Sequence, residues 1–223
     1  MANKNLKDNR ASFWDNSTRS YIVFMGILAW LTASVHGISE ILQGNTPTGG
    51  FVLTTIGAFS IIPNYLLTGM ATLIVALSLV IWTTGYIHKK NGPTVFLILA
   101  ILLFLVGGGV AQVAFTPIVW AVSTRINKPL AWWRNFLHDN IRKQLADLWP
   151  ALFAMGSAVL SIGIGIWLIL LPPDVTHNVS IINYICWACI AIGFILQLFI
   201  IVSGFARDIE NHKTIINATQ TPR

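Results

Sequence analysis

Long apolar runs alternate with short polar segments along most of this chain. About 20 apolar residues are enough to cross a bilayer as a helix. Runs of this kind predict five membrane spans, at residues 21–42, 65–87, 95–115, 151–171 and 181–206. The polar segments 1–20 and 207–223 are predicted to be solvated tails on either side of a single membrane domain, 21–206. The pattern therefore predicts an all-α fold, a polytopic membrane helix bundle.

Residues 128–149 have a different, amphipathic pattern. Apolar residues recur there at three- and four-residue steps and form one face of a helix: Leu130, Trp133, Leu137, Ile141, Leu145 and Leu148. Basic residues occupy the other face: Arg134, His138, Arg142 and Lys143. Tryptophan rings and basic groups arranged in this way are typical of a helix that lies in the membrane interface. We therefore predict one cytoplasmic interfacial helix over 128–149.

The distribution of positive charge bears on the number of spans. The 14 Lys and Arg lie in the N-terminal tail, at 89–90, in the segment 125–149 and after residue 206. Loops rich in Lys and Arg stay on the cytoplasmic side. Five spans divide these charges without a clear bias. A sixth span at 46–63 would place all of them except the pair at 89–90 in the cytoplasm, together with both termini, and this arrangement is preferred.

A second arrangement also keeps the two termini on the cytoplasmic side. Gly107–Gly109 and Pro117 interrupt the apolar stretch 95–124, which predicts a break in the helix. If the chain entered the membrane and returned at these glycines, every Lys and Arg would lie in the cytoplasm. Irregular backbone at membrane depth needs cover from protein or water, which a small chain barely supplies. For this reason the six-span arrangement is preferred.

Composition agrees with a membrane location. Apolar residues make up 55% of the chain and charged residues only 10%, against about 25% charged in a soluble domain. The net charge of +6 indicates contact with anionic lipid of the cytoplasmic leaflet and not with nucleic acid, because no separate soluble domain is present to bind it. We expect an integral protein of the cell membrane whose partners are the lipid bilayer and a second copy or another membrane subunit.

Small residues repeat at four-residue steps in two of the predicted spans. Thr68, Thr72 and Ala76 form one such row, and Ala154, Ala158 and Gly165 lie along a face of another span. Small side chains let membrane helices approach closely. Both rows are therefore predicted to be helix contacts.

His36 and Glu40 are the candidate binding residues. They lie four residues apart in the first span, on one helix face and within hydrogen-bonding reach. Titratable groups at membrane depth are costly and therefore mark functional sites by default. One interpretation is a proton-relay or cation site with Glu40 as the base and His36 as its partner. The alternative is a satisfied pair close to the membrane interface.

Cys186 and Cys189 are the weaker, catalytic candidates. They form Cys-Trp-Ala-Cys in the last span, with Cα atoms about 5 Å apart on a helix, which permits a disulfide. The motif resembles the cysteine pair of membrane thiol–quinone oxidoreductases, such as the disulfide-bond formation protein B and vitamin K epoxide reductase families. The resemblance covers these four residues only, and the second cysteine pair of those families is missing here. Two inert buried thiols are the alternative.

Common motifs of metal and phosphate sites are not found in the sequence. No His/Cys spacing predicts a zinc site, no Gly-Lys-Ser/Thr loop predicts a phosphate site, and no cofactor is expected. The preferred hypothesis is a non-enzymatic membrane protein, a small transporter-like or accessory subunit. The alternatives are a thiol–quinone oxidoreductase and a structural or partner-binding subunit that docks through its interfacial helix.

Overall fold

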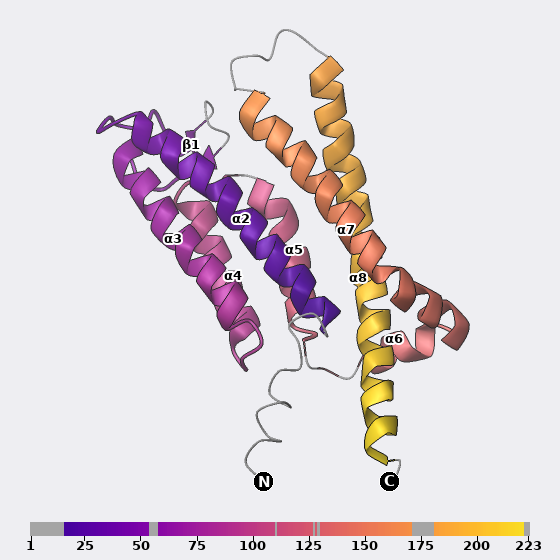
Figure 1. The fold of residues 1–223 in the computed structure, drawn as a ribbon. Coiled ribbons are helices and arrows are strands. Elements are labelled where there is room, and N and C mark those ends of the chain that lie inside the picture. The colour runs from indigo at the N-terminus through magenta and orange to yellow at the C-terminus, as the bar shows by residue number, and fades with distance from the viewer. Residues whose placement is uncertain are drawn as a thin grey trace, which may run out of the picture.

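The computed structural model describes residues 16–53, 58–109, 111–126, 128, 130–170 and 181–220. This part of the chain is helical apart from one short β-hairpin (Figure 1). Four helices are long and apolar enough to cross a membrane: α2 (Ser17–Leu42), α3 (Tyr65–Gly85), α7 (Asp139–Leu170) and α8 (Ile181–Gln220). The predicted helical fold is therefore confirmed, and four of its helices are suited to crossing a membrane.

Three further helices are shorter. They are α4 (Gly92–Leu105), α5 (Ala111–Ser123) and α6 (Ala131–Phe136). At 1.5 Å per residue α4 and α5 are each about 20 Å long, and neither could cross a hydrocarbon layer of roughly 30 Å. The two strands, β1 (Val52–Leu53) and β2 (Ala58–Phe59), pair antiparallel.

The helices form two groups that lie side by side (Figure 1). Helices α2 to α5 make one group, and the antiparallel pair α7 and α8 makes the other. The start of α2, the turn between α3 and α4, the end of α5, α6 and the last part of α8 all lie at one end of the molecule. Together with the start of α7 and with residues 125 and 128 after α5, these segments carry every Lys and Arg of the described chain, so we call this end the basic end. The β-hairpin lies at the opposite end.

The prediction of a membrane span at 46–63 is wrong. The described residues of this segment form the β-hairpin and two isolated bridges, not a helix. Ser60 pairs with Val106, and the Ile61 amide donates to Leu105 O across 3.0 Å. The Phe59 ring stacks on Phe104 at 5.2 Å. Phe59 therefore packs on the end of α4, and the Gly, Pro and Asn residues of the segment favour turns over a helix.

The single span predicted over 95–115 is also wrong, whereas the predicted break at the glycines is confirmed. Helix α4 ends at Leu105, and α5 begins at Ala111. Gly107 has a φ of +114°, and the Gly108 amide donates to Leu103 O across 2.8 Å. This is the turn that commonly ends helices at a glycine with left-handed backbone. Figure 1 shows α5 running back towards the basic end beside α4.

The amphipathic segment 128–149 is not one helix, which corrects the prediction. Helix α6 ends at Phe136, Leu137 is extended, and α7 begins at Asp139. Helix α7 then continues through Pro150 into the predicted span 151–171 without a break. An acidic residue in the first turn favours a helix start at Asp139. The polar residues from 207 likewise continue α8, up to Gln220.

Helices α2 and α3 pack closely along a row of small residues. Thr68, Thr72 and Ala76 are fully buried, as their spacing predicts. At Gly69 an added Cβ would overlap the carbonyl oxygen of Gly37 and lie 2.7 Å from a side-chain atom of Ile41. The two backbones are therefore in contact, which is how small residues bring helices together.

The contact between α7 and α8 uses other residues than predicted. A Cβ added at Gly156 would lie 2.7 Å from Ile200 Cδ1, and a Cβ added at Gly193 would lie 2.8 Å from Leu160 Cα. The predicted row of Ala154, Ala158 and Gly165 does not make this contact, because the two alanines are exposed and Gly165 has no atom close to its missing Cβ. In a chain rich in Gly and Ala, spacing alone did not identify the packed face.

We predict that Gly69→Ala lowers the free energy of unfolding by about 1–3 kcal/mol, because the new methyl group forces two backbones apart. Gly85→Ala, in the same helix, is the control, since nothing lies within 4 Å of its missing Cβ. The control should be neutral or stabilised by up to about 1 kcal/mol through helix propensity. Thermal unfolding in detergent, followed by tryptophan fluorescence, measures both. Equal changes in the two variants would contradict the close contact.

Candidate functional site

The structure brings the two predicted binding residues against the break between α4 and α5. His36 and Glu40 are both buried on α2, and Glu40 is 0% exposed. A Cβ added at Gly107 would overlap Glu40 Oε1, and one added at Gly109 would lie 2.6 Å from His36 Nε2. The backbone of the break therefore lies directly on both side chains. We call His36, Glu40, Thr72 and the stretch Gly107–Gly109 the Glu40 site.

Glycine is required at the break for two reasons. Gly107 and Gly109 have φ angles of +114° and +92°, which side chains other than glycine rarely adopt. The space that a side chain would need is taken by Glu40 and His36. The glycines therefore let main chain reach the two titratable groups at close range.

Hydrogen bonding at the Glu40 carboxyl is incomplete. Thr72 Oγ1 lies 2.6 Å from Val106 O and 3.3 Å from Glu40 Oε2, with both oxygens in position to accept from it. A hydroxyl has only one hydrogen to donate, so the shorter contact with the Val106 carbonyl takes it. Glu40 Oε1 has no hydrogen-bond partner among the described residues. An unsatisfied buried carboxyl oxygen is costly, and such an atom in a folded protein calls for an explanation.

The β-hairpin and its bridges close the site on the side away from the basic end. The hydroxyl groups of Ser60 and Thr68 are hydrogen-bonded at 3.0 Å, and Thr68 Oγ1 also lies 3.1 Å from Ile62 O. Thr68 Cγ2 is one of the atoms that a Cβ at Gly107 would meet. The hairpin, its bridges and Thr68 of α3 thus form a cover over the Glu40 site.

The site also contacts the second helix group. The rings of His36 and Trp167 on α7 are 5.9 Å apart and tilted by 55°. Further along, Phe115 on α5 meets Phe194 on α8 edge to face at 5.4 Å. The Glu40 site therefore lies inside the bundle, between the hairpin, α3, the two short helices and α7.

The second pair of candidates, Cys186 and Cys189, lies on α8 far along the chain from this site. Both are free thiols, and Cys186 is fully buried. Cys186 Sγ lies 3.3 Å from Gly163 O as a donor, and a Cβ added at Gly163 would be 3.0 Å from the Cys189 Cβ. Both cysteines therefore line the packed contact between α7 and α8. Such a contact supports the packing interpretation of this pair.

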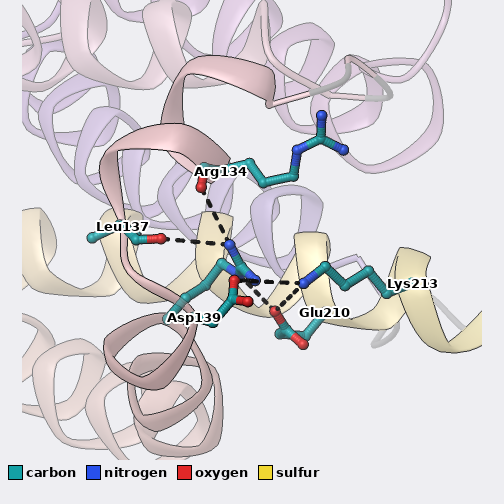
Figure 2. Close-up of polar contacts among 6 residues, drawn as sticks. Arg134, Leu137, Asp139, Glu210 and Lys213 are labelled. Atoms are coloured by element: carbon teal, nitrogen blue, oxygen red, sulfur yellow. Dashed lines mark hydrogen bonds and ion pairs between the residues drawn. The ribbon is translucent and has the colours of Figure 1, made fainter.

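An ion-pair network at the basic end was missed by the sequence analysis. Arg142 was predicted to lie on the basic face of an interfacial helix, towards the lipid headgroups, but its side chain is only 2% exposed. Its Nε donates to Glu210 Oε1 across 2.6 Å, another nitrogen pairs with Asp139, and Nη1 lies 3.3 Å from Arg134 O. Figure 2 shows this network, which joins the end of α6, the start of α7 and α8.

The network explains why α6 and α7 meet at an angle instead of forming one helix. Arg142 also lies 3.5 Å from Leu137 O, so that the carbonyls at the end of α6 converge on one guanidinium (Figure 2). Lys213 extends the network, with its Nζ 3.5 Å from Glu210 Oε1. The available sequence signal was the three-residue spacing of Asp139 with Arg142 and of Glu210 with Lys213, in two segments predicted to share the cytoplasmic side.

Other kinds of site find no support in the described part of the chain. No group of three or more His, Cys, Asp or Glu there could hold a metal ion. Comparisons with family models, with curated proteins and with solved structures found no match to this chain. The geometry of the Glu40 site is therefore the feature of the molecule that points to a function.

We predict that Arg142→Met lowers the free energy of unfolding by about 2 kcal/mol or more, because it removes the shortest ion pairs of Glu210 and Asp139 and leaves the α6 carbonyls without this donor. Lys143→Met is the matched control, since this neighbouring side chain is exposed and outside the network; its effect should stay within about 0.5 kcal/mol. Urea or thermal unfolding in mild detergent measures both variants. If the two changes were equal, the network would not contribute to stability.

Proposed function

We propose that this chain is a small, non-enzymatic, transporter-like protein of the cell membrane in which Glu40 takes up and releases a proton. The observation that carries the proposal is a fully buried carboxyl, one of its oxygens unpaired, pressed against the break between two short helices. Ionisable groups at membrane depth mark ion and proton pathways. Discontinuous helices whose ends meet inside the membrane are the usual setting of transport sites.

The proposed topology has four spans, α2, α3, α7 and α8, with α4 and α5 entering from the basic end and returning to it. The basic end would face the cytoplasm by the positive-inside rule. Both termini and the ion-pair network then lie on the cytoplasmic side, and the hairpin lies outside. The short helices receive the protein cover that re-entrant backbone needs from α2, α3, the hairpin and α8.

A proton on Glu40 Oε2 would supply the hydrogen that the contact with Thr72 lacks. Protonated Oε2 could donate to Thr72 Oγ1, whose own hydrogen goes to Val106 O at 2.6 Å. Release of the proton would leave a buried carboxylate in a tight site, a state that requires an approaching cation, water or the His36 imidazole one turn away. The same carboxyl would thus couple proton occupancy to the position of the α4–α5 break.

Access to Glu40 in this proposal depends on the cover. The site as described is closed, because Glu40 is fully buried under the hairpin and its bridge to Val106. The hairpin is attached to the end of α4 by the bridge of Ser60 to Val106 and the stacking of Phe59 on Phe104, and a two-stranded hairpin is only marginally stable by itself. Movement of the hairpin would open the site to the outside while α2 and α3 stay in contact.

The topology predicts the side of the membrane on which Lys89 lies. A six-span protein would place residue 89 outside, whereas the re-entrant arrangement places it in the cytoplasm. We expect Lys89→Cys, made in a chain with Cys186→Ala and Cys189→Ala, to resist an impermeant maleimide applied to intact cells. Gly49→Cys in the loop before the hairpin should react, and Lys143→Cys should be protected. Rapid labelling of Lys89→Cys from outside would overturn the re-entrant arrangement.

The transport proposal predicts that Glu40→Gln abolishes proton movement while the protein still assembles, because the amide keeps the shape of the side chain but exchanges no proton. The assay uses purified protein in liposomes with a trapped pH-sensitive dye and an imposed pH gradient at clamped potential. We expect wild-type vesicles to equilibrate faster than empty ones, and the Glu40→Gln vesicles to match the empty ones.

Asp147→Asn is the control for this experiment, because Asp147 is an exposed carboxylate on α7 outside the site. It should leave proton movement at the wild-type rate. Equal rates in wild-type and empty vesicles would contradict the transport proposal. If Glu40→Gln instead prevented assembly, the result would favour the alternative, a structural or accessory subunit in which Glu40 holds the break in place.

A further inference from the structure

A pocket at the basic end has a composition suited to an anion. It has a volume of about 490 Å³, within the roughly 300–1,000 Å³ of ligand sites in proteins. It lies where the segment after α5, helix α6, helix α8 and the start of α2 meet. Its lining residues are Asn16, Arg125, Lys128, Leu130, Ala131, Arg134, Asp208, Ile209, His212 and Lys213. We call it the basic pocket.

Three of the lining cations are not used within the protein. Arg125, Lys128 and Arg134 are exposed, and among the described residues none of them makes a salt bridge. Lys213 is only partly engaged, at 3.5 Å from Glu210 and 3.8 Å from Asp139. The pocket therefore concentrates positive charge that no salt bridge among the described residues neutralises.

The one acidic side chain of the pocket is already occupied. Asp208 accepts hydrogen bonds from the amides of Ser17 and Thr18, at 2.7 and 3.0 Å, and from the Thr18 hydroxyl. It caps the start of α2, where a carboxylate is favoured by the free amides and by the helix dipole. Its charge is thus directed at the helix end, and a ligand in the pocket would meet mainly Arg and Lys.

The surroundings of the pocket favour a lipid as the source of the anion. Helix α6, which lines it, carries the stacked rings of Trp132 and Phe136, each 65% exposed. Exposed aromatic side chains next to basic ones are typical of segments at the level of lipid headgroups. Basic pockets between helices on the cytoplasmic side bind acidic headgroups.

We propose that the basic pocket binds the phosphate-containing headgroup of an anionic phospholipid from the cytoplasmic leaflet. Arg125, Lys128 and Arg134 contact the phosphate, Arg134 being suited to a bidentate contact. Leu130 and Ile209 lie beside the headgroup, and the aromatic side chains of α6 anchor the adjoining interface. The inference shares its membrane orientation with the proposed function but does not involve Glu40.

Native mass spectrometry of the full chain in detergent tests the proposal. Phosphatidylglycerol and phosphatidylcholine with the same acyl chains are added in equal amounts. We expect the wild type to retain phosphatidylglycerol at least about tenfold more than phosphatidylcholine, because each Lys or Arg at the surface strengthens binding roughly fivefold. No preference between the two lipids would overturn the proposal, and this measurement requires no variant.

The variant Arg125→Gln/Lys128→Gln/Arg134→Gln removes the three free cations. It should lower the retention of phosphatidylglycerol by at least about tenfold. The variant Lys89→Gln/Lys90→Gln/Lys143→Gln is the matched control, because it removes three exposed cations of the same end outside the pocket. Its retention should stay within about twofold of the wild type. Equal losses in both variants would assign binding to the general charge of this end and overturn the pocket.

A competition experiment separates the two sources of phosphate. Inorganic phosphate in millimolar excess should leave the bound phosphatidylglycerol in place if the lipid is the ligand. Complete displacement would show a site for soluble phosphate and overturn the lipid assignment. Glu40→Gln should retain phosphatidylglycerol as the wild type does, so that failure of this proposal and failure of the transport proposal are distinguishable.

Discussion

The arrangement of this bundle depends on how the carbonyls at the end of α4 are satisfied. A helix end buried inside a protein leaves acceptors that no water reaches, and each must find a donor within the protein. Three separate parts of the chain supply donors here: Gly108 to Leu103 O, Ile61 to Leu105 O and Thr72 to Val106 O. The glycine turn, the hairpin and helix α3 are therefore tied to one point, and Glu40 lies beside it.

The basic end is organised by the same requirement. The amides at the start of α2 are satisfied by Asp208 of α8, and the carbonyls after α6 are satisfied by Arg142 of α7. Each of these charges is used at a helix end, where backbone groups lack partners. Three exposed cationic side chains outside these contacts border a pocket, which lies at the depth of lipid headgroups in the proposed orientation. Asp208 and Arg142 thus join helices at this end, whereas the cations of the pocket would face the membrane surface in the proposed orientation.

The positions of the long helices and two members of the candidate site, His36 and Glu40, could be predicted from the pattern of apolar and polar residues along the chain. The apolar runs identified the four long helices, the triple glycine identified the break, and the four-residue spacing placed His36 and Glu40 on one face of the first helix. The pattern failed at 46–63 because apolar composition does not distinguish a membrane helix from a hairpin that covers a helix end. It failed at Arg142 because a helical wheel cannot show that a carboxylate from a distant helix will meet a basic side chain.

The sequence by itself determined that this is a helical membrane protein, where its helices break, and which titratable residues lie in its apolar segments. These features depend on neighbouring residues and on the cost of placing polar groups in hydrocarbon. Only the tertiary structure decided that the break at Gly107 lies on Glu40, that the hairpin covers both, and that Arg142 is buried. These contacts join residues far apart in the chain, and their partners are chosen by the packing of whole helices.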